Sequence, residues 1–391
     1  MATSIPPSAA IPPLLKHLNE RTVLEAIRTG APISRAEISR RAGISKPTVS
    51  LALQTLRDAG LVREAAPAPG RPSYGAVFFE PVPDAALVLG LDLGARFLRG
   101  AICDLRGEIR ARQDVELRDA DAERALDAIA ELRASLVDAT GLPGHVLDGV
   151  VVGVPGVVAG DVGEVSLANV AQLEGRRFGD ELRDRLGLPV TLENDINLAA
   201  LGEQWRGIAR GVDDFVFLSV GTGLGAGLVL RGELHRGHHG AAGEVDYALG
   251  GFGQEVDPCA SAVSAYAAEL AGRDGAATAL EPPYDARAIF AAARAGDGLA
   301  RAVVDEVARR ITLHIGPIAA VADVALVVLG GGLGTNGDLL LAPVREQLAR
   351  WLPYPPRVEV SSLGEAAVLS GALAVGLRSA LDNVFHRRAR V

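Results

Sequence analysis

The chain has 391 residues, of which 49% are hydrophobic and only 4% aromatic, with 46 glycines and a net charge of −9. This length allows two or three domains with a sizeable core, and the composition excludes a disordered chain. No apolar run reaches the roughly 20 residues that span a bilayer, and the N-terminus lacks the features of a signal peptide, so we expect a cytoplasmic protein without membrane contact.

Residues 11–80 are predicted to form a winged helix-turn-helix domain. Three helices are expected, at residues 19–29, 35–42 and 46–60. Ser34 and Ser45 are suited to cap the second and third helices, and the glycine turn 43–45 lies between them. Two short strands, 61–64 and 75–79, would flank a Pro/Gly-rich loop as the wing. Residues 1–80 carry a net charge of +4 and the remainder −13, so we expect only this head to meet a polyanion.

The N-terminal part of the third helix is the segment that enters the major groove in helix-turn-helix proteins. Polar side chains there are suited to base edges and phosphates, and arginines nearby to phosphate or to a narrow minor groove. The predicted DNA-binding residues are Arg35, Lys46, Thr48, Ser50, Gln54 and, at the tip of the wing, Arg71. A solvated basic face, and a loop arginine without a specific partner, are the alternatives.

After a predicted linker at 81–86, the body at 87–391 contains an internal repeat. The order strand, glycine turn, strand occurs at 86–104 and again at 215–230. Such a repeat predicts two similar lobes with a cleft between them, lobe one at about 87–200 plus the C-terminal helix and lobe two at about 201–363. The glycines at 221–225 would let backbone N–H groups approach an anion, although glycine-rich hairpins without a ligand are common.

Residues 192–197 follow a strand-like run at 188–191 and precede a helix predicted at 198–205. The C-terminal edge of a strand faces the crevice where α/β sheets bind ligands. Asp195 can act there as general base to a sugar hydroxyl, or can simply accept a hydrogen bond from it. Asn194 can contact the ligand or cap the following helix.

Motifs along the body resemble the ROK family of bacterial sugar kinases and sugar-responsive repressors. They are Asp92-Leu93-Gly94, 152–156, Asn169, 193–197, 221–227, 239–244, 329–333 and 364–372. The resemblance implies an actin-like α/β body, and the fused head is similar to that of the family's regulators. It also implies that Asn194 and Asp195 contact sugar hydroxyls, that Asp195 is the catalytic base in kinase members, and that Glu244 holds the sugar from the other lobe. Asn169 resembles a further sugar contact.

Three departures from the family pattern bear on function. Ala95 and Arg96 replace a Gly-Thr pair that serves the ATP phosphates, and we expect the bulky arginine to block or replace the nucleotide. Tyr247 stands where the family has a histidine that serves both zinc and sugar. The family's cysteine cluster is reduced to Cys259, and one thiol without a neighbouring histidine cannot build a closed zinc site.

These features predict a sugar-responsive DNA-binding repressor of carbohydrate metabolism genes. Its expected partners are a double-stranded DNA operator and a sugar or sugar derivative, bound without phosphorylation and without zinc or ATP. A homodimer is expected because helix-turn-helix proteins usually bind paired half-sites. An ATP-dependent sugar kinase with a fused DNA-binding head, and a DNA-binding protein whose body only dimerises, are the competing hypotheses.

Overall fold

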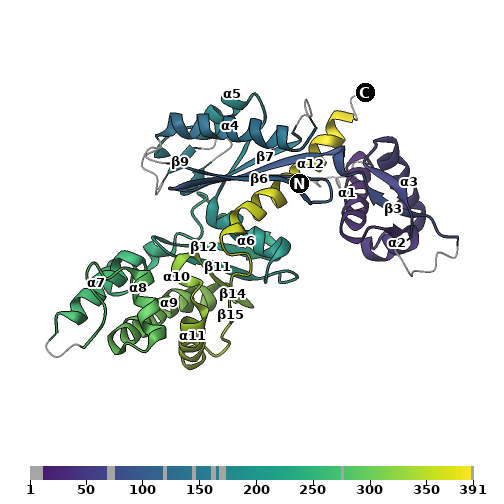
Figure 1. The fold of residues 1–391 in the computed structure, drawn as a ribbon. Helices are drawn as coiled ribbons and strands as arrows, with labels where there is room; N and C mark the ends of the chain where they lie inside the picture. The colour runs from purple at the N-terminus through teal and green to yellow at the C-terminus, as the bar shows by residue number, and fades with distance from the viewer. Residues whose placement is uncertain are drawn as a thin grey trace, which may run out of the picture.

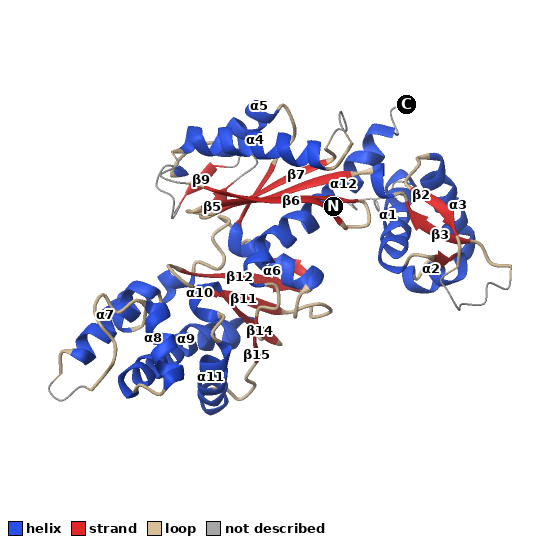
Figure 2. Cartoon of the chain, in the orientation of Figure 1, coloured by secondary structure: helices blue, strands red, loops and turns tan. Residues whose placement is uncertain are grey.

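The computed structural model arranges the chain as a small head and two larger lobes (Figures 1 and 2). It describes residues 12–67, 75–117, 121–142, 147–159, 164–166, 173–273 and 277–388. Among the helices in these ranges, none has the length and apolar character needed to cross a membrane.

The head consists of three helices and a small sheet. The helices are α1 (Pro12–Gly30), α2 (Arg35–Ala42) and α3 (Lys46–Asp58). The sheet has the order β1-β3-β2, with β1 at Ile33–Ser34, β2 at Val62–Ala65 and β3 at Phe78–Pro81. Both predicted caps are confirmed, because Ser34 Oγ accepts from the Glu37 N–H at 3.3 Å and Ser45 Oγ from the Thr48 N–H at 3.4 Å. The first helix begins seven residues before its predicted start at Asn19, since a proline is tolerated in a first helical turn.

The head is docked on a turn of lobe one. Ala86 belongs to the predicted linker and Leu105 to the body in sequence, yet both are fully buried in the hydrophobic core of the head. Arg106, in the same turn, forms an ion pair with Glu80 of β3 at 2.6 Å. The predicted linker 81–86 includes the last residue of β3 and a short 3-10 helix, η1 (Pro83–Ala85). The head is therefore in direct contact with this turn.

The two lobes share one sheet topology, which confirms the predicted repeat. The strands of lobe one are β4 (Leu87–Leu93), β5 (Phe97–Asp104), β6 (Ile109–Glu116), β7 (Gly149–Val154) and β10 (Thr191–Asn194). Those of lobe two are β11 (Phe215–Val220), β12 (Leu224–Leu230), β13 (Glu233–Leu234), β14 (Leu326–Gly330) and β15 (Arg357–Val360). The orders are β6-β5-β4-β7-β10 and β13-β12-β11-β14-β15, and in both sheets the hairpin pairs are antiparallel and the last two pairs parallel. A two-stranded ribbon, β8 (Val157–Ala159) with β9 (Glu164–Ser166), follows β7.

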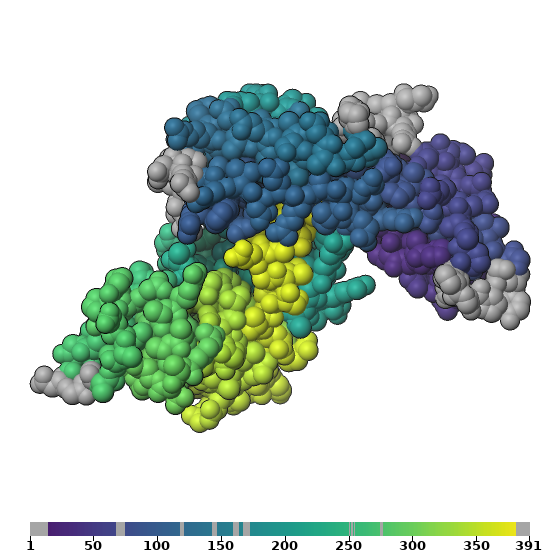
Figure 3. All heavy atoms as spheres, in the orientation of Figure 1, coloured from purple at the N-terminus to yellow at the C-terminus, as the bar shows by residue number. Residues whose placement is uncertain are grey.

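Helices cover both sheets. In lobe one, α4 (Ala122–Ala139) and α5 (Phe178–Leu186) lie on one face, and α12 (Ala367–Arg388) packs on β4 and β7 from the other. Lobe two carries η3 (Val245–Glu255), α7 (Ala260–Ala271), α8 (Ala286–Ala295), α9 (Gly298–Ala322), α10 (Gly331–Gly334), α11 (Gly337–Trp351) and η4 (Gly364–Ala366). The α6 helix (Asp195–Arg206) packs on α12 and on the sheet of lobe two. The C-terminal segment thus runs between the lobes, where Figure 3 shows it at the surface.

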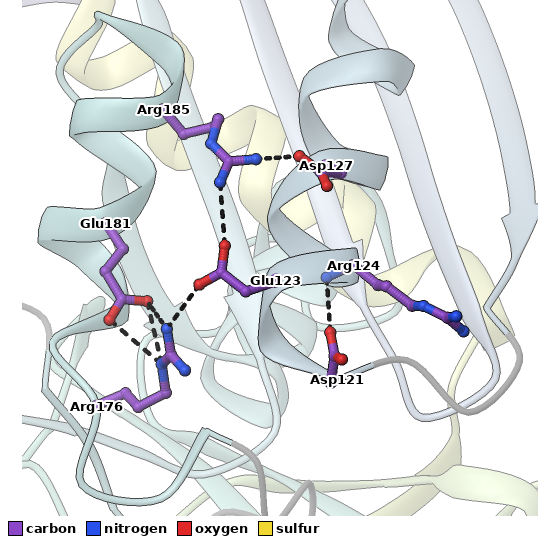
Figure 4. Close-up of polar contacts among 7 residues, drawn as sticks. All are labelled: Asp121, Glu123, Arg124, Asp127, Arg176, Glu181 and Arg185. Carbon is purple, nitrogen blue, oxygen red and sulfur yellow. Dashed lines mark hydrogen bonds and ion pairs between the residues drawn. The ribbon is translucent and has the colours of Figure 1, made fainter.

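A network of ion pairs fastens α5 to α4 (Figure 4). Glu123 of α4 accepts from Arg176 at 3.2 Å and from Arg185 at 3.1 Å. Arg176 also pairs with Glu181 at 2.8 Å, and Arg185 with Asp127. Exposed pairs of this kind contribute little individually, so their main effect is to orient α5, which precedes β10.

Candidate functional site

A cavity of about 830 Å³ lies between the end of β10 in lobe one and the glycine turn of lobe two. Asn194 and Asp195 form one wall, and Glu244, the turn 221–225 and residues of 331–336 form the other. The structure thus brings together three of the four predicted sugar-binding residues. The fourth, Asn169, lies outside the described residues. The volume falls within the range of small-molecule sites in proteins.

Asn194 and Asp195 stand at the N-terminus of α6. The strand and the helix meet at Asn194, so the predicted strand at 188–191 lies too early and the helix predicted at 198–205 begins three residues too late. Asn194 Oδ1 accepts from the Asn197 N–H at 2.9 Å, and its Nδ2 donates to the Gly156 carbonyl at 2.9 Å. The capping role is therefore confirmed, and the amide retains one N–H and one lone pair for a ligand.

Glu193 connects the two lobes, a role that the sequence did not reveal. Its side chain is 6% exposed, and Oε1 accepts from the Asn194 N–H and from Asn197 Nδ2, each at 3.0 Å. Its Oε2 accepts from Arg236 Nε at 2.7 Å. Arg236 belongs to the lobe-two segment 235–244, which ends at Glu244. This pair therefore ties one wall of the cavity to the other.

The carboxyl groups at this end of the cavity hold protons more tightly than usual. Burial, followed by the charges of Asp92 and Glu244, raises the pKa of Asp195 to about 7, against an opposing hydrogen bond from the Ile196 N–H. Burial and the charge of Asp246 raise the pKa of Glu244. A carboxyl that titrates near neutral pH can donate or accept a hydrogen bond, which suits sugar hydroxyls, and it also suits a general base.

Asp92, near the end of β4, is paired with an arginine that was not singled out from the sequence. Asp92 is 6% exposed and accepts from Arg99 Nη1 at 3.3 Å; Arg99 also lies 3.2 Å from Glu365. Burial raises the pKa of Asp92 to about 6, although Arg99 acts in the opposite direction. The side chain of Arg96, which was expected to block or replace the nucleotide, is 78% exposed, lies 4.0 Å from Glu116 and is not among the residues that line the cavity.

Two further lining residues come from the segment after Glu244. Asp246 and Tyr247 both face the cavity, and Tyr247 is 67% exposed. The sequence marked Tyr247 only as a departure from the family pattern. A tyrosine ring has an apolar face and a polar tip, so it can contact both apolar and polar parts of a ligand.

Among the described residues of the head, three of the predicted DNA-binding side chains lie close together. Arg35, Ser50 and Gln54 line a shared shallow groove together with Arg57. Lys46 is exposed at the first turn of α3, which is the end expected to enter a major groove. These positions fit contact with a nucleic acid backbone and its base edges.

Two hydroxyls of α3 are already engaged within the helix. Thr48 Oγ1 lies 2.8 Å from Ser45 Oγ, and Ser50 Oγ donates to the Lys46 carbonyl at 2.9 Å. Leu51, which the sequence analysis did not consider, is 58% exposed on α3. An exposed leucine there can contact a thymine methyl group. Arg71 lies outside the described residues.

The fold and these two surfaces define a winged helix-turn-helix head fused to a two-lobed actin-like body. The chain belongs to the ROK family, whose model matches residues 88–379, and a MarR family model matches residues 17–72. The combination of both is that of a ROK family transcriptional regulator.

The relatives of this chain include both repressors and glucokinases. A xylose repressor from Caldicellulosiruptor bescii is 28% identical over 392 residues, covering 94% of this chain and 98% of that protein. A glucokinase from Streptomyces coelicolor is 31% identical over 314 residues, covering 73% of this chain and 96% of the enzyme. Among solved structures, a ROK family transcriptional regulator homologous to the E. coli MLC protein has a TM-score of 0.78 at 23% identity, over 95% of this chain and 98% of that one.

Proposed function

We propose that this chain is a repressor that leaves its operator when a sugar binds in the cavity between the lobes, and that it does not phosphorylate the sugar. The observation that carries the proposal is that Asn194, Asp195 and Glu244 line one cavity in a chain whose head presents an exposed α3. The relatives named xylose repressors make xylose the first sugar to test.

Each cavity residue has a chemical role in this proposal. Asp195 and Glu244 accept hydrogen bonds from sugar hydroxyls or, when protonated, donate one. Asn194 offers its remaining N–H. Asp246 adds an acceptor, and the ring of Tyr247 can cover the apolar face of the sugar.

The α6 helix supports a route from the cavity to the head. It begins at Asp195 and, at 1.5 Å per residue over 12 residues, extends about 18 Å to Arg206. There Arg206 Nη2 donates to the Gly107 carbonyl at 2.5 Å, beside Leu105 in the core of the head. If a sugar prefers one arrangement of the lobes, α6 shifts with them and the head follows. The shift is limited by the difference in sugar affinity between the two arrangements.

The hypothesis that the chain is a kinase is supported by the pKa of Asp195, which is near the ideal for a general base at neutral pH. Against it stands Asp92, whose carboxylate is bound by Arg99 instead of being open to a nucleotide or its metal ion. The glycine turn 221–225 and residues 331–336 still line the cavity. The lobe-two side could therefore contact ATP, whereas Asp92 in lobe one is already bound by Arg99. We therefore propose that the body functions without ATP.

One pair of measurements on the full chain separates the hypotheses. The first is a coupled assay of ADP release over a panel of sugars beginning with xylose and glucose. The second is release of a DNA duplex, selected by the chain from a random library, followed by fluorescence anisotropy. We expect sugar-dependent DNA release without turnover. ADP release that disappears in Asp195→Asn would establish the kinase instead. A melting temperature that no sugar shifts would favour a body that only dimerises.

A further inference from the structure

The segment 245–257 contributes Asp246 and Tyr247 to the cavity. It also occupies the place where the resemblance to the ROK family implies a zinc site. The donor set does not fit that metal: within the described ranges, no three His, Cys, Asp or Glu side chains are arranged to hold an ion. Cys259 is buried at the N-cap of α7, whereas His238 and His239 are exposed and their rings pack edge to face, with centroids 4.5 Å apart. A closed zinc site requires four converging ligands.

Helix α9 holds this segment by three side-chain contacts to three consecutive carbonyl groups. Arg309 Nη2 donates to the Glu255 carbonyl at 3.3 Å. His314 Nε2 lies 3.1 Å from the Val256 carbonyl, and a neutral imidazole protonated at Nε2 donates there. Arg310 Nη1 donates to the Asp257 carbonyl at 2.8 Å. We refer to Arg309, Arg310 and His314 as the α9 clamp.

Arg310, the buried arginine of the clamp, is itself held in place by other side chains. Arg310 is 4% exposed, its Nε donates to Glu306 at 2.9 Å, and its guanidinium lies 5.0 Å from the ring centre of Tyr266 in α7. Burial raises the pKa of Glu306, but the hydrogen bonds and charges of Arg309 and Arg310 outweigh it and leave that pKa below its usual value. The buried guanidinium thus has a charged partner as well as its carbonyl, so it is oriented before any ligand arrives.

We propose that the α9 clamp replaces the family's zinc, and that its members are positioning residues which hold Glu244, Asp246 and Tyr247 at the cavity without a metal ion. The role at the cavity rests on the function proposed above, whereas the anchoring of 245–257 does not. The clamp contacts main-chain carbonyls, so it fixes the path of the segment while leaving its side chains free for a sugar.

Metal content of the full chain gives the first test. We expect far less than one zinc per chain by mass spectrometry after purification, and the same melting temperature with and without EDTA. Stoichiometric zinc whose removal by EDTA lowers the melting temperature would overturn the proposal.

Hydrogen exchange of the segment gives the second test, with a matched pair of variants. Arg310→Met removes the contact to the Asp257 carbonyl. Arg301→Met is the control, because Arg301 lies on the same helix and donates to a carbonyl elsewhere, that of Ala293 at 3.3 Å. We expect exchange across 245–257 to rise about tenfold in Arg310→Met only, which corresponds to about 1.4 kcal/mol. Unchanged exchange there would overturn the clamp. Should Arg310→Met fail to fold, His314→Leu removes a neutral contact and carries the same expectation.

Sugar affinity gives the third test. By calorimetry, we expect xylose, or whichever sugar shifts the wild-type melting temperature, to bind Arg310→Met about tenfold more weakly and Arg310→Lys at an intermediate level. Equal affinity in wild type and Arg310→Met would overturn the positioning role. If no sugar binds the wild type, the proposed function fails, while the metal and exchange measurements still decide the clamp.

Discussion

Arg236 Nε donates a hydrogen bond to Glu193 Oε2 at 2.7 Å and thereby joins a segment of lobe two to the strand of lobe one that leads into Asp195. Glu193 is almost fully buried and also orders the backbone of Asn194, so a single carboxylate fixes the cap of α6 and the segment that ends at Glu244. The relative position of the two walls of the cavity therefore depends on this pair.

Removing Arg236 should loosen the cavity more than it unfolds the chain. In Arg236→Met, Glu193 keeps its contacts in lobe one but loses a charged donor, and we expect the free energy of unfolding to fall by about 1 to 3 kcal/mol. Urea denaturation measures this change, and calorimetry should show weaker sugar binding. Arg273→Met, which removes an exposed pair with Glu269 on α7, serves as control and should alter neither quantity. Sugar affinity equal to that of the wild type in Arg236→Met would contradict the role of the pair.

Asp195 should make the chain less stable as pH rises. Its pKa is about 7 in the folded chain and near 3.8 when unfolded, so between these values the folded state keeps a proton that the unfolded state has lost. Stability then falls with rising pH by at most about 1.4 kcal/mol per unit and levels off above the folded pKa. Asp195→Asn removes this loss. We expect a variant that melts higher than wild type above about pH 7 and equally near about pH 4, and that no longer responds to sugar. A variant less stable than wild type at alkaline pH would contradict this account.

Replacing each of the two arginines near the first glycine turn should change the stability of the chain by very different amounts. Arg99→Ala leaves the buried Asp92 without its counter-ion, and breaking such a pair costs about 3 to 5 kcal/mol. The pKa of Asp92 should also rise above its wild-type value of about 6, because Arg99 lowers it. Arg96→Ala removes an exposed side chain and should change stability by less than about 1 kcal/mol. Thermal denaturation of the two variants side by side tests this; a loss of stability in Arg96→Ala similar to that in Arg99→Ala would contradict this account.

Local signals in the sequence predicted local structure well. Ser34 and the glycine that ends α2 gave that helix its observed bounds, and Ser45 gave α3 its observed start, because capping acts within a few residues. The sequence also predicted that Asn194, Asp195 and Glu244 belong to one site, although only through the resemblance to a family. Residues that act through distant partners were missed.

The missed contacts join residues far apart in the chain. Glu193 and Arg236 are 43 positions apart, and Arg310 and Asp257 are 53 apart, so no periodicity connects them. The exception is Arg99, which stands directly across from Asp92 in the β4–β5 hairpin. Counting outward from the glycine turn would have paired the two, since cross-strand neighbours of opposite charge interact.

Substitutions at different positions of α3 should affect the affinity and the sequence specificity of DNA binding separately. Lys46 lies at the end of α3 expected to contact phosphate, so Lys46→Ala should weaken binding to all duplexes alike and reduce the salt dependence by about one counterion. Gln54 and Leu51 are exposed further along the helix, and their alanine variants should each cost about 1 to 3 kcal/mol on the selected duplex but little on a scrambled one. Anisotropy titrations at several salt concentrations measure both effects. A uniform loss over all sequences for Gln54→Ala would place that residue on the phosphate backbone instead.

Arg206 should be needed for the response to sugar but not for DNA binding. Its hydrogen bond to the Gly107 carbonyl links the end of α6 to the turn on which the head is docked, and its guanidinium also lies 4.0 Å from the ring centre of Trp205. Arg206→Met keeps most of the length of the side chain and removes the donor, so we expect a loss of stability of about 1 kcal/mol and nearly unchanged affinity for the duplex and for the sugar. What should disappear is the coupling between them, measured as the ratio of duplex affinities with and without saturating sugar, because the shift of α6 no longer reaches the turn. Arg210→Met, four residues further on and exposed, is the matched control. A wild-type ratio in Arg206→Met would mean that the signal reaches the head by another route, such as α12.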